Sequence, residues 1–524
     1  MRKLILLLSI SFFYHKICTA QFYFNNYYTR DSGYYYFTGS IILHDHIYVL
    51  SQFNDPSTNS SWGLTALFKL DMSGRVISID TFLPRGKDVF FFQHKIQAIN
   101  DSTLFFGALD TTNAYGVYYN TNNHKIKYSK FQPILGKYFY YNPCTFQVNG
   151  TEIYATAEWN RFRIVNGGKY IVGDMVLTKM REGHIILKKV ISEMDFTLNL
   201  GNIKYNNDGT FYTLGDYTNY IHPFEEKHIF GQNIYHFDTA FNLIKRIISP
   251  KEKRFGIVND LVKNGNGDLY CASNIETFHD TPGGTYLEED PCISKYDSLG
   301  KYLWTKTYNN NSEFGEDKFN SITLSKDHRS ILAVGIIFSH DYQDTISYSV
   351  KKGFIVSISE NGDSLWQRQY IARGDEDYYN SSKFLDIKLC PDGGYLLCGS
   401  SVINPPPFPD NYSQAGWLMK VDEYGCYIPG CHLVGIKQES KDEIEIKLFP
   451  NPTSEFISVI HGYDRPLDVE IVNVNGTKII SFRKVHPLET NFLPLIGFPA
   501  GQYFMNFYNA GNLVKSKSFM IQAN

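Results

Sequence analysis

Apolar and polar positions alternate along most of the chain with a period of two residues, the pattern of strands rather than helices. One recurring unit is an apolar run, a turn rich in Asn, Asp or Gly, and a second apolar run that ends near Gly or Ala. Each copy predicts a β-hairpin. Clear copies occupy 203–215, 261–272, 322–335 and 387–399, and weaker copies occupy 37–50, 96–107 and 146–157.

A second recurring unit alternates with the first and also reads as strand, turn and strand. Asp-Gly and Asn-Gly steps in its turns supply the positive φ angles of tight hairpins. The anchors of these turns follow one another about every 60 residues, and a fixed period of this kind indicates a repeat architecture. They stand at Asp71, Asn120, Met180, Asp238, Asp297, Ser359 and Asp422.

Two hairpins per period make a four-stranded unit. Seven copies predict an all-β fold, a seven-bladed β-propeller over residues 21–436. A stack of β-sandwich modules is the alternative, but each module would need about 100 residues. Trp304 and Trp366 stand at the same place in successive repeats, so we expect both to pack between blades.

Residues 1–20 have the pattern of a secretory signal peptide. Arg2 and Lys3 precede an apolar run over 4–13, and small residues stand at 19–20. A buried N-terminal strand is the alternative, and the run is too short to span a bilayer. We therefore expect export through the Sec translocon. No later segment is apolar over the length that a transmembrane helix needs.

The character of the sequence changes after residue 436. Residues 437–445 are charged and linker-like, and 446–524 contain short apolar runs with turn signals at Asn475-Gly476 and Ala510-Gly511. About 80 residues of this kind suit a small β-sandwich. The sequence thus predicts a separate C-terminal domain at 446–524.

Blocks of this C-terminal segment follow one another in order: Pro450, Asn451 and Pro452 at the start, Asn475 and Gly476 in the central turn, and Gly501 and Tyr503 in the penultimate strand. With these blocks the segment resembles the type A C-terminal sorting domain of the bacterial type IX secretion system. The resemblance implies that the type IX machinery is a partner and that the product is secreted or reaches the outer cell surface. In many family members the domain is cleaved, and the cargo is released or attached to surface lipopolysaccharide. An ordinary accessory β-sandwich would not explain all the matching blocks together.

The repeats, over roughly 34–432, resemble secreted β-propeller proteins that carry Asp-x-x-Gly-x-x-x-Trp segments. That resemblance implies the fold and leaves the function open.

The chain has eight Cys, of which Cys18 lies in the signal peptide. An exported chain can form disulfides. Positions relative to the turns suggest that Cys390 pairs with Cys398, Cys426 with Cys431, and Cys271 with Cys292, which leaves Cys144 single. The alternative is that these residues are reduced and pack in the core.

Composition supports the strand prediction and limits the function classes. Tyr and Phe number 39 each, and aromatics make up 16% of the chain, as expected for β-structure with a large core. Lys and Arg number 50 and Asp and Glu 53, for a formal net charge of −3. This balance excludes a globally basic nucleic-acid-binding protein.

The sequence contains no Gly-x-Ser-x-Gly elbow, His-Glu-x-x-His helix, P-loop or dinucleotide fingerprint. His44 and His46 share one strand face as a candidate metal pair, and acidic residues at 341–344 and 375–377 could hold calcium or supply paired carboxylates. Both patterns are more typical of solvated polar surfaces. We therefore expect no cofactor and assign no catalytic residue.

Long loops interrupt some repeats, and loops on a rigid scaffold often carry binding residues. The candidates for a glycan or peptide surface are Trp159, Tyr217, Tyr220 and His222. Ordinary loop packing in a Tyr-rich protein is the alternative.

Two hypotheses for the function remain. The favoured one is an exported, non-catalytic propeller that binds an extracellular protein or glycan. The other is a secreted hydrolase or lyase with its site in the propeller channel, which predicts carboxylates or His converging at one channel mouth. Whether the protein is an enzyme stays open.

Overall fold

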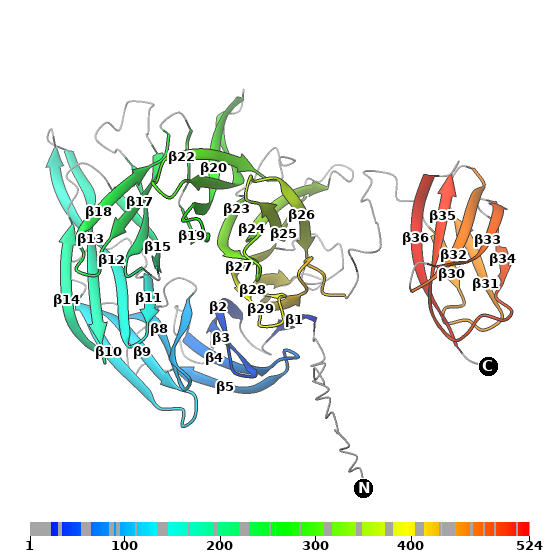
Figure 1. The fold of residues 1–524 in the computed structure, drawn as a ribbon, viewed down its shortest axis with the longest axis horizontal. Helices are drawn as coiled ribbons and strands as arrows, with labels where there is room; N and C mark the ends of the chain where they lie inside the picture. Colours follow the sequence, from blue (N-terminus) through cyan, green and yellow to red (C-terminus); the bar gives the residue numbers. More distant parts are fainter. Residues whose placement is uncertain are drawn as a thin grey trace, which may run out of the picture. The chain divides into compact units, whose positions relative to one another are not determined.

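The structure is a computed structural model of the chain, shown in Figure 1. The chain divides into two compact units, Met1–Cys431 and His432–Asn524. The regular secondary structure of the described residues consists of β-strands. The structure describes residues 23–29, 34–53, 64–82, 89–90, 95–110, 113–133, 145–165, 168–191, 197–206, 208–218, 230–250, 253–256, 258–281, 284–308, 317–341, 348–371, 381–403, 413–428, 431, 446–461, 465–474, 477–486, 489–509 and 512–522.

Strands of the first unit form consecutive antiparallel sets that surround a common centre (Figure 1). The first three sets are β2 (Tyr35–Leu43), β3 (His46–Phe53), β4 (Leu64–Asp71) and β5 (Val76–Phe82); β6 (Val89–Phe90), β7 (Ile96–Asn100), β8 (Thr103–Asp110), β9 (Asn113–Asn120) and β10 (Ile126–Pro133); and β11 (Thr145–Asn149), β12 (Glu152–Val165), β13 (Gly168–Arg181) and β14 (His184–Ile191).

Four further sets complete the described part of this unit. They are β15 (Thr197–Tyr205), β16 (Phe211–Thr218), β17 (Phe230–Phe237) and β18 (Leu243–Ile248); β19 (Asp260–Lys263), β20 (Leu269–Thr281), β21 (Gly284–Tyr296) and β22 (Tyr302–Thr307); β23 (Lys318–Leu324), β24 (Ser330–Asp341), β25 (Tyr348–Ser359) and β26 (Ser364–Tyr370); and β27 (Ser381–Leu389), β28 (Tyr395–Ile403), β29 (Ser413–Val421) and the N-terminal β1 (Phe24–Tyr28).

The first unit therefore has the repeated four-stranded sheets of a β-propeller. One strand of each set, the first in every set except the second, contacts its counterparts in the neighbouring sets, in the order β2, β7, β11, β15, β19, β23, β27 and again β2. These strands lie innermost in the ring (Figure 1). The last two sets are joined in one sheet by a single parallel pair, Lys351 with Ser381. The number of blades in the complete chain stays a prediction.

The two ends of the first unit meet in one sheet. Strand β1 pairs antiparallel with β29 in a register that runs from Phe24–Lys420 to Tyr28–Gly416. The indole Nε1 of Trp417 donates a hydrogen bond of 2.6 Å to Asn25 Oδ1. The N-terminal strand thus serves as the outermost strand of the last set, and this pairing closes the ring.

Turns of the second repeat unit are held by the side chain of the anchor residue. Asp71 Oδ1 accepts hydrogen bonds from the backbone N–H of Ser73 at 2.9 Å and of Arg75 at 3.0 Å. Equivalent bonds organise the turns at Asp238, Asp297 and Asp422. These Asx turns confirm the hairpins expected at those anchors.

Neighbouring sheets pack against each other at the same turns. A Cβ atom on Gly362 would lie 2.7 Å from the Trp304 ring, and one on Gly425 would lie 2.7 Å from the Trp366 ring. Both tryptophans therefore pack against a glycine of the next sheet, as their repeated position predicts. A tyrosine directly after the outer strand β22 adds a hydrogen bond between the neighbouring sheets, because Tyr308 Oη donates to the Gly362 carbonyl at 2.9 Å.

The second unit is a β-sandwich of two sheets over one apolar core that includes Val459, Val469, Met505 and Phe507. One sheet contains β30 (Ile446–Phe449), β31 (Phe456–His461) and β34 (Asn491–Pro494). The other contains β33 (Lys478–Val485), β32 (Leu467–Asn473), β35 (Gly501–Asn509) and β36 (Asn512–Ile521).

One of the three expected disulfides is present. Cys426 and Cys431 are bonded, with Cα atoms 5.7 Å apart. The other two pairs are wrong, because Cys271, Cys292, Cys390 and Cys398 are buried free thiols. Cys144 lies outside the described residues.

The strand register explains both errors. Cys271 stands opposite Ser294 and Cys292 opposite Ser273, so the two thiols are diagonal neighbours rather than a facing pair. Diagonal residues are too far apart for a disulfide. Cys390 opens the turn, whereas Cys398 lies inside β28 opposite Asp386.

Candidate functional site

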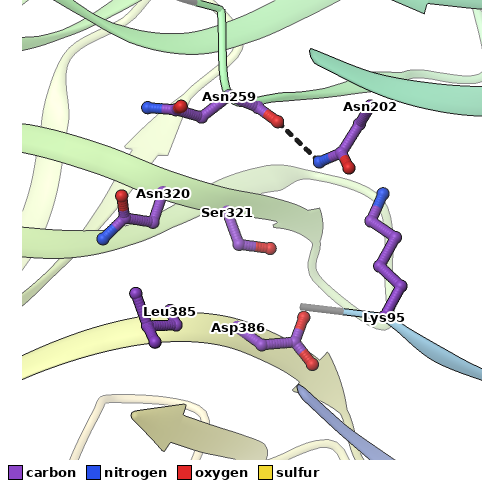
Figure 2. Close-up of a pocket in the computed structure, with 7 residues that line it drawn as sticks. All are labelled: Lys95, Asn202, Asn259, Asn320, Ser321, Leu385 and Asp386. Atoms are coloured by element: carbon purple, nitrogen blue, oxygen red, sulfur yellow. Dashed lines mark hydrogen bonds between the residues drawn. The ribbon is translucent and has the colours of Figure 1, made fainter. Parts of the chain in front are cut away.

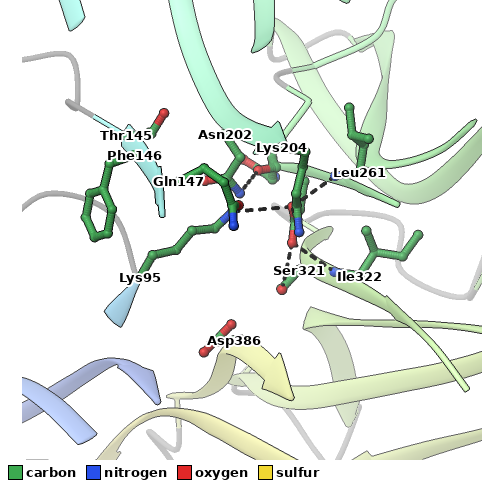
Figure 3. A network of polar contacts seen from close by, with 12 residues as sticks. Lys95, Thr145, Phe146, Gln147, Asn202, Lys204, Leu261, Ser321, Ile322 and Asp386 are labelled. Atoms are coloured by element: carbon green, nitrogen blue, oxygen red, sulfur yellow. Dashed lines mark hydrogen bonds and ion pairs between the residues drawn. The ribbon is translucent and has the colours of Figure 1, made fainter. Parts of the chain in front are cut away.

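Innermost strands of the first unit bring polar side chains to its centre. β-bulges interrupt β15, β23 and β27 next to these residues, and a bulge redirects the neighbouring side chains. We call the resulting group the axial cluster. It consists of Lys95, Asn202, Lys204, Asn259, Asp260, Asn320, Ser321, Asp386 and Lys388. Figure 2 shows those that line the central cavity, and Figure 3 adds Lys204.

Asp260 is the centre of the charged contacts. Its carboxylate lies 3.0 Å from Lys204 Nζ and 3.6 Å from Lys95 Nζ, and Ser321 Oγ donates to it at 2.9 Å (Figure 3). Burial opposes ionisation of this carboxyl, but the two lysines outweigh burial and hold its pKa well below the usual range. Asp260 is therefore a permanent anion and cannot act as a proton donor near neutral pH.

Asp386 is paired separately. Its carboxylate accepts from Lys388 Nζ at 2.7 Å and from the backbone N–H of Ser40 at 3.0 Å. Burial alone would lower the pKa of Lys388, yet the contact with Asp386 raises it above the ordinary value. Both carboxylates of the axial cluster are thus engaged by ammonium groups of the same chain.

A relay of amides links the innermost strands of successive sheets. Asn202 Nδ2 donates to the Asn259 carbonyl at 2.5 Å (Figure 2), and Asn259 Nδ2 donates to the Phe319 carbonyl at 2.7 Å. Asn320 Nδ2 continues the relay to the Phe384 carbonyl at 2.7 Å. These bonds satisfy buried polar groups and fix the distance between neighbouring strands.

Lys95 differs from the other two lysines of the axial cluster. Its side chain is 9% exposed, and its ammonium group makes no hydrogen bond to any described residue. Burial lowers its pKa to about 7, more than the attraction of Asp260 raises it. Lys95 lines a cavity of about 40 Å³ together with Asn202, Asn259, Asn320, Ser321, Leu385 and Asp386 (Figure 2).

This geometry limits the chemistry that the axial cluster can perform. A cavity of this volume admits a few water molecules and is far smaller than the sites that enclose a sugar or a peptide. Among the described residues, no group of three or more His, Cys, Asp or Glu side chains could hold a metal ion. The axial cluster is first of all a buried, largely self-paired polar core.

The candidate ligand residues lie elsewhere. Trp159 belongs to strand β12 opposite Asp174, and Tyr217 belongs to β16 opposite Gly231, so the expected loops at these two positions are extended ladders. Tyr220 and His222 lie outside the described residues. His44 sits in the turn that leads to β3 and contacts the Asp101 carbonyl through Nε2 at 2.9 Å.

Three hairpins are longer than the rest. The β12–β13 ladder has 14 residues in each strand, against eight in β3 and in β4. The β20–β21 and β24–β25 hairpins have 13 and 12 residues per strand. Because the ladders are antiparallel, these hairpins extend from the end opposite to the Asx turns. We call that end the hairpin face.

In the second unit, the segment that opens the sandwich is bonded to the strand that ends it. Asn451 Oδ1 accepts a hydrogen bond of 2.9 Å from the backbone N–H of Met520. Thr453 forms a parallel bridge with Ile521, with bonds from Thr453 N to the Met520 carbonyl and from Gln522 N to the Thr453 carbonyl. The residues that flank Pro450 and Pro452 thus join both ends of the sandwich.

Tyr503, another residue of the predicted sorting motif, lies in strand β35. Its hydroxyl donates to the Pro499 carbonyl at 2.9 Å, and its ring packs at 5.6 Å from Phe498 and 5.9 Å from Phe519. The central turn is closed by Asn473 Oδ1, which accepts from Thr477 N at 2.9 Å. Asn475 and Gly476 lie outside the described residues.

This sandwich is where the chain matches a known family. The family described as "Secretion system C-terminal sorting domain" matches residues 447–522. These residues form a sorting domain. It indicates export by the type IX secretion system, to the outer cell surface or the medium, with the secretion machinery as a partner. Within the described residues, no helix is long and apolar enough to cross a membrane.

Solved structures similar to the chain share little sequence with it. A protein of unknown function from Bacteroides caccae is 11% identical, with coverage of 65% of this chain and 94% of that one and a TM-score of 0.30. Semaphorin 2a of Drosophila is 10% identical, with coverage of 97% and 100% and a TM-score of 0.44. The polysaccharide lyase Uly1 is 9% identical, with coverage of 74% and 90% and a TM-score of 0.43. A search of the curated proteins found no match.

Proposed function

We propose that the exported propeller is a non-catalytic module that binds an extracellular protein or glycan through its hairpin face. The observation that carries this proposal is that the charged side chains of the axial cluster are paired with one another. Asp260 and Asp386 are buried and paired with lysines of the same chain, and the cavity lined by Lys95 and Asp386 has a volume of about 40 Å³. A substrate would have to displace these pairs in order to reach either carboxylate.

The hairpin face supports the same proposal. Six extra residues per strand, as in β12 relative to β3, extend a hairpin by roughly 20 Å at about 3.3 Å per residue. Extensions of this length carry the backbone of the hairpins beyond the ring, where loops of a rigid scaffold recognise ligands. Export by the sorting domain places that face outside the cell.

The experiment uses the complete exported chain recovered from outside the cells. It is screened for binding to glycans, peptides and extracellular proteins, and the same panel is assayed for turnover. Each long hairpin is then shortened in turn; in β12–β13, an Asn-Gly turn replaces residues 160–173. We expect at least one shortened variant to lose about tenfold or more in affinity, as for a contact that anchors an interface.

Leu299→Ala is the matched control, because Leu299 is 73% exposed in an Asx turn at the opposite end of the sheets. It should leave affinity unchanged. Turnover of a panel compound by the unaltered chain would refute the proposal, and so would a ligand whose affinity survives shortening of all three hairpins.

One observation favours a second candidate, a hydrolase or lyase that works at the axis. Lys95 lines a cavity and has a pKa of about 7, and an amine of that pKa can accept a proton at neutral pH. This candidate requires Lys95→Met to abolish turnover while binding to the hairpin face is kept.

A further inference from the structure

The axial cluster contains an imbalance of charge. Three ammonium groups, those of Lys95, Lys204 and Lys388, face the two carboxylates of Asp260 and Asp386. Lys204 and Lys388 lie within 3.0 Å of their carboxylates, whereas Lys95 lies 3.6 Å from the carboxylate that it shares with Lys204. One positive charge of the cluster therefore has no counterpart of its own.

The unmatched charge is the one that faces the cavity. Lys95 is more than nine-tenths buried, donates no hydrogen bond to a described residue and extends towards Asn202 along the wall of the cavity (Figure 2). A buried ammonium group that shares its only nearby counter-charge, here Asp260 at 3.6 Å, with a second lysine is costly. Water in the cavity would solvate the group without neutralising it.

We propose that the cavity is a site for a small monovalent anion of the halide type, held by the ammonium group of Lys95 and the neighbouring amide of Asn202. The second N–H of the Asn202 amide group adds donor capacity, because this group uses only one N–H for the relay between strands. One monovalent anion would balance the cluster.

Size and charge define the class of ligand. A volume of about 40 Å³ suits a monatomic ion and excludes a sugar, a nucleotide or a peptide. A cation is disfavoured, because Lys95 and Lys204 both lie beside Asp260. Asp386 also lines the cavity, so the ion should sit on the side of Lys95 and Asn202.

The site has a structural consequence. The anion would neutralise the point where innermost strands β7, β15, β19 and β27 converge, and a ligand that binds only the folded state stabilises it by mass action. This inference goes beyond the proposed binding at the hairpin face and does not depend on it.

The direct test is a bromide-soaked crystal of the unaltered full chain, in which bromide is located by its anomalous scattering. We expect a peak in the cavity, in contact with Lys95 Nζ. A map in which bromide occurs only at the surface, or not at all, would overturn the proposal.

A solution test uses the melting temperature at constant ionic strength, with chloride or bromide exchanged for gluconate, which is too large for the cavity. We expect the melting temperature to shift upward with halide concentration, more at pH 6 than at pH 8.5, because the protonated amine binds the anion. Lys95→Met should remove the shift. Lys301→Met, at an exposed lysine, should keep it. A halide shift of the same size in Lys95→Met would contradict the site.

Discussion

At the scale of single residues, the axial cluster shows how geometry decides the state of a buried lysine. Lys388 has a carboxylate at 2.7 Å, and its pKa is raised. The Lys95 side chain is 9% exposed, against 32% for Lys388, and lies beside a carboxylate at 3.6 Å that also binds Lys204; its pKa falls to about 7. The attraction between Lys95 and Asp260 weakens with distance and is shared with Lys204. Lys95 nevertheless bears the whole free-energy cost of losing its own hydration.

This difference predicts how stability depends on pH. The ammonium group of an unfolded Lys95 keeps its proton up to about pH 10, whereas the folded one loses it near pH 7. Between these values the unfolded chain binds more protons, so the contribution of Lys95 to stability rises with pH. The groups that face Lys95 in this range are Asp260, Asp386, Lys204 and Lys388.

Urea unfolding of the unaltered chain and of Lys95→Met, in halide-free buffer between pH 6.5 and 9, measures this dependence. We expect the unaltered chain to gain stability relative to Lys95→Met as the pH rises. Parallel curves for the two proteins would show that Lys95 keeps its proton in the folded state.

At the scale of elements, the sequence predicted hairpins and their turns better than it predicted the site. An Asp anchor bonds to N–H groups two and four residues ahead, so the turn is a local property. The axial cluster brings Lys95, Asp260 and Asp386 together from three distant repeats, and no local sequence pattern indicates that they lie close to one another.

A signal for the cluster did exist. Asn202, Asp260, Ser321 and Asp386 each stand directly before the apolar run of a repeat, at a position that is buried in the structure. A small polar residue at the same place in successive repeats indicates a position that faces an axis rather than a core. The wrong disulfides have a related cause, since the spacing of Cys390 and Cys398 across a turn does not give the strand register.

The contact between neighbouring sheets can be tested at Gly362. This residue has a φ of +81°, and an added Cβ would lie 2.7 Å from the Trp304 ring. Gly150 has a φ of +57° with no atom within 4 Å of an added Cβ. Substitution by Ala strains the backbone at both positions, but only Gly362→Ala also overpacks the contact, which costs about 1–3 kcal/mol more.

Chemical denaturation of Gly362→Ala and Gly150→Ala provides the comparison. Equal losses of stability in the two variants would mean that Trp304 moves away at no cost, and the contact would then contribute little to the ring.

At the scale of the whole molecule, the sorting domain folds around its own core, so it can be removed without opening the propeller. We expect a chain without residues 446–524 to remain inside the cell envelope, whereas Asn451→Ala, which loses the bond to Met520 N, should be exported less efficiently. Cell fractionation and intact-protein mass measure both outcomes. Leu299→Ala serves as an exported control, and normal export of the shortened chain would contradict the role of the domain.

Closure of the ring by β1 has a consequence for the order of events during export. The first strand of the chain pairs with β29, about 390 residues later, and contacts of such sequence separation form late and slowly. Until then β29 presents an open strand edge, the kind of edge that a strand from another copy can occupy. A translocated chain is therefore most vulnerable to strand exchange in the interval before its own β1 pairs with β29. A free peptide with the sequence of residues 21–29 would compete with β1 for this edge in that interval.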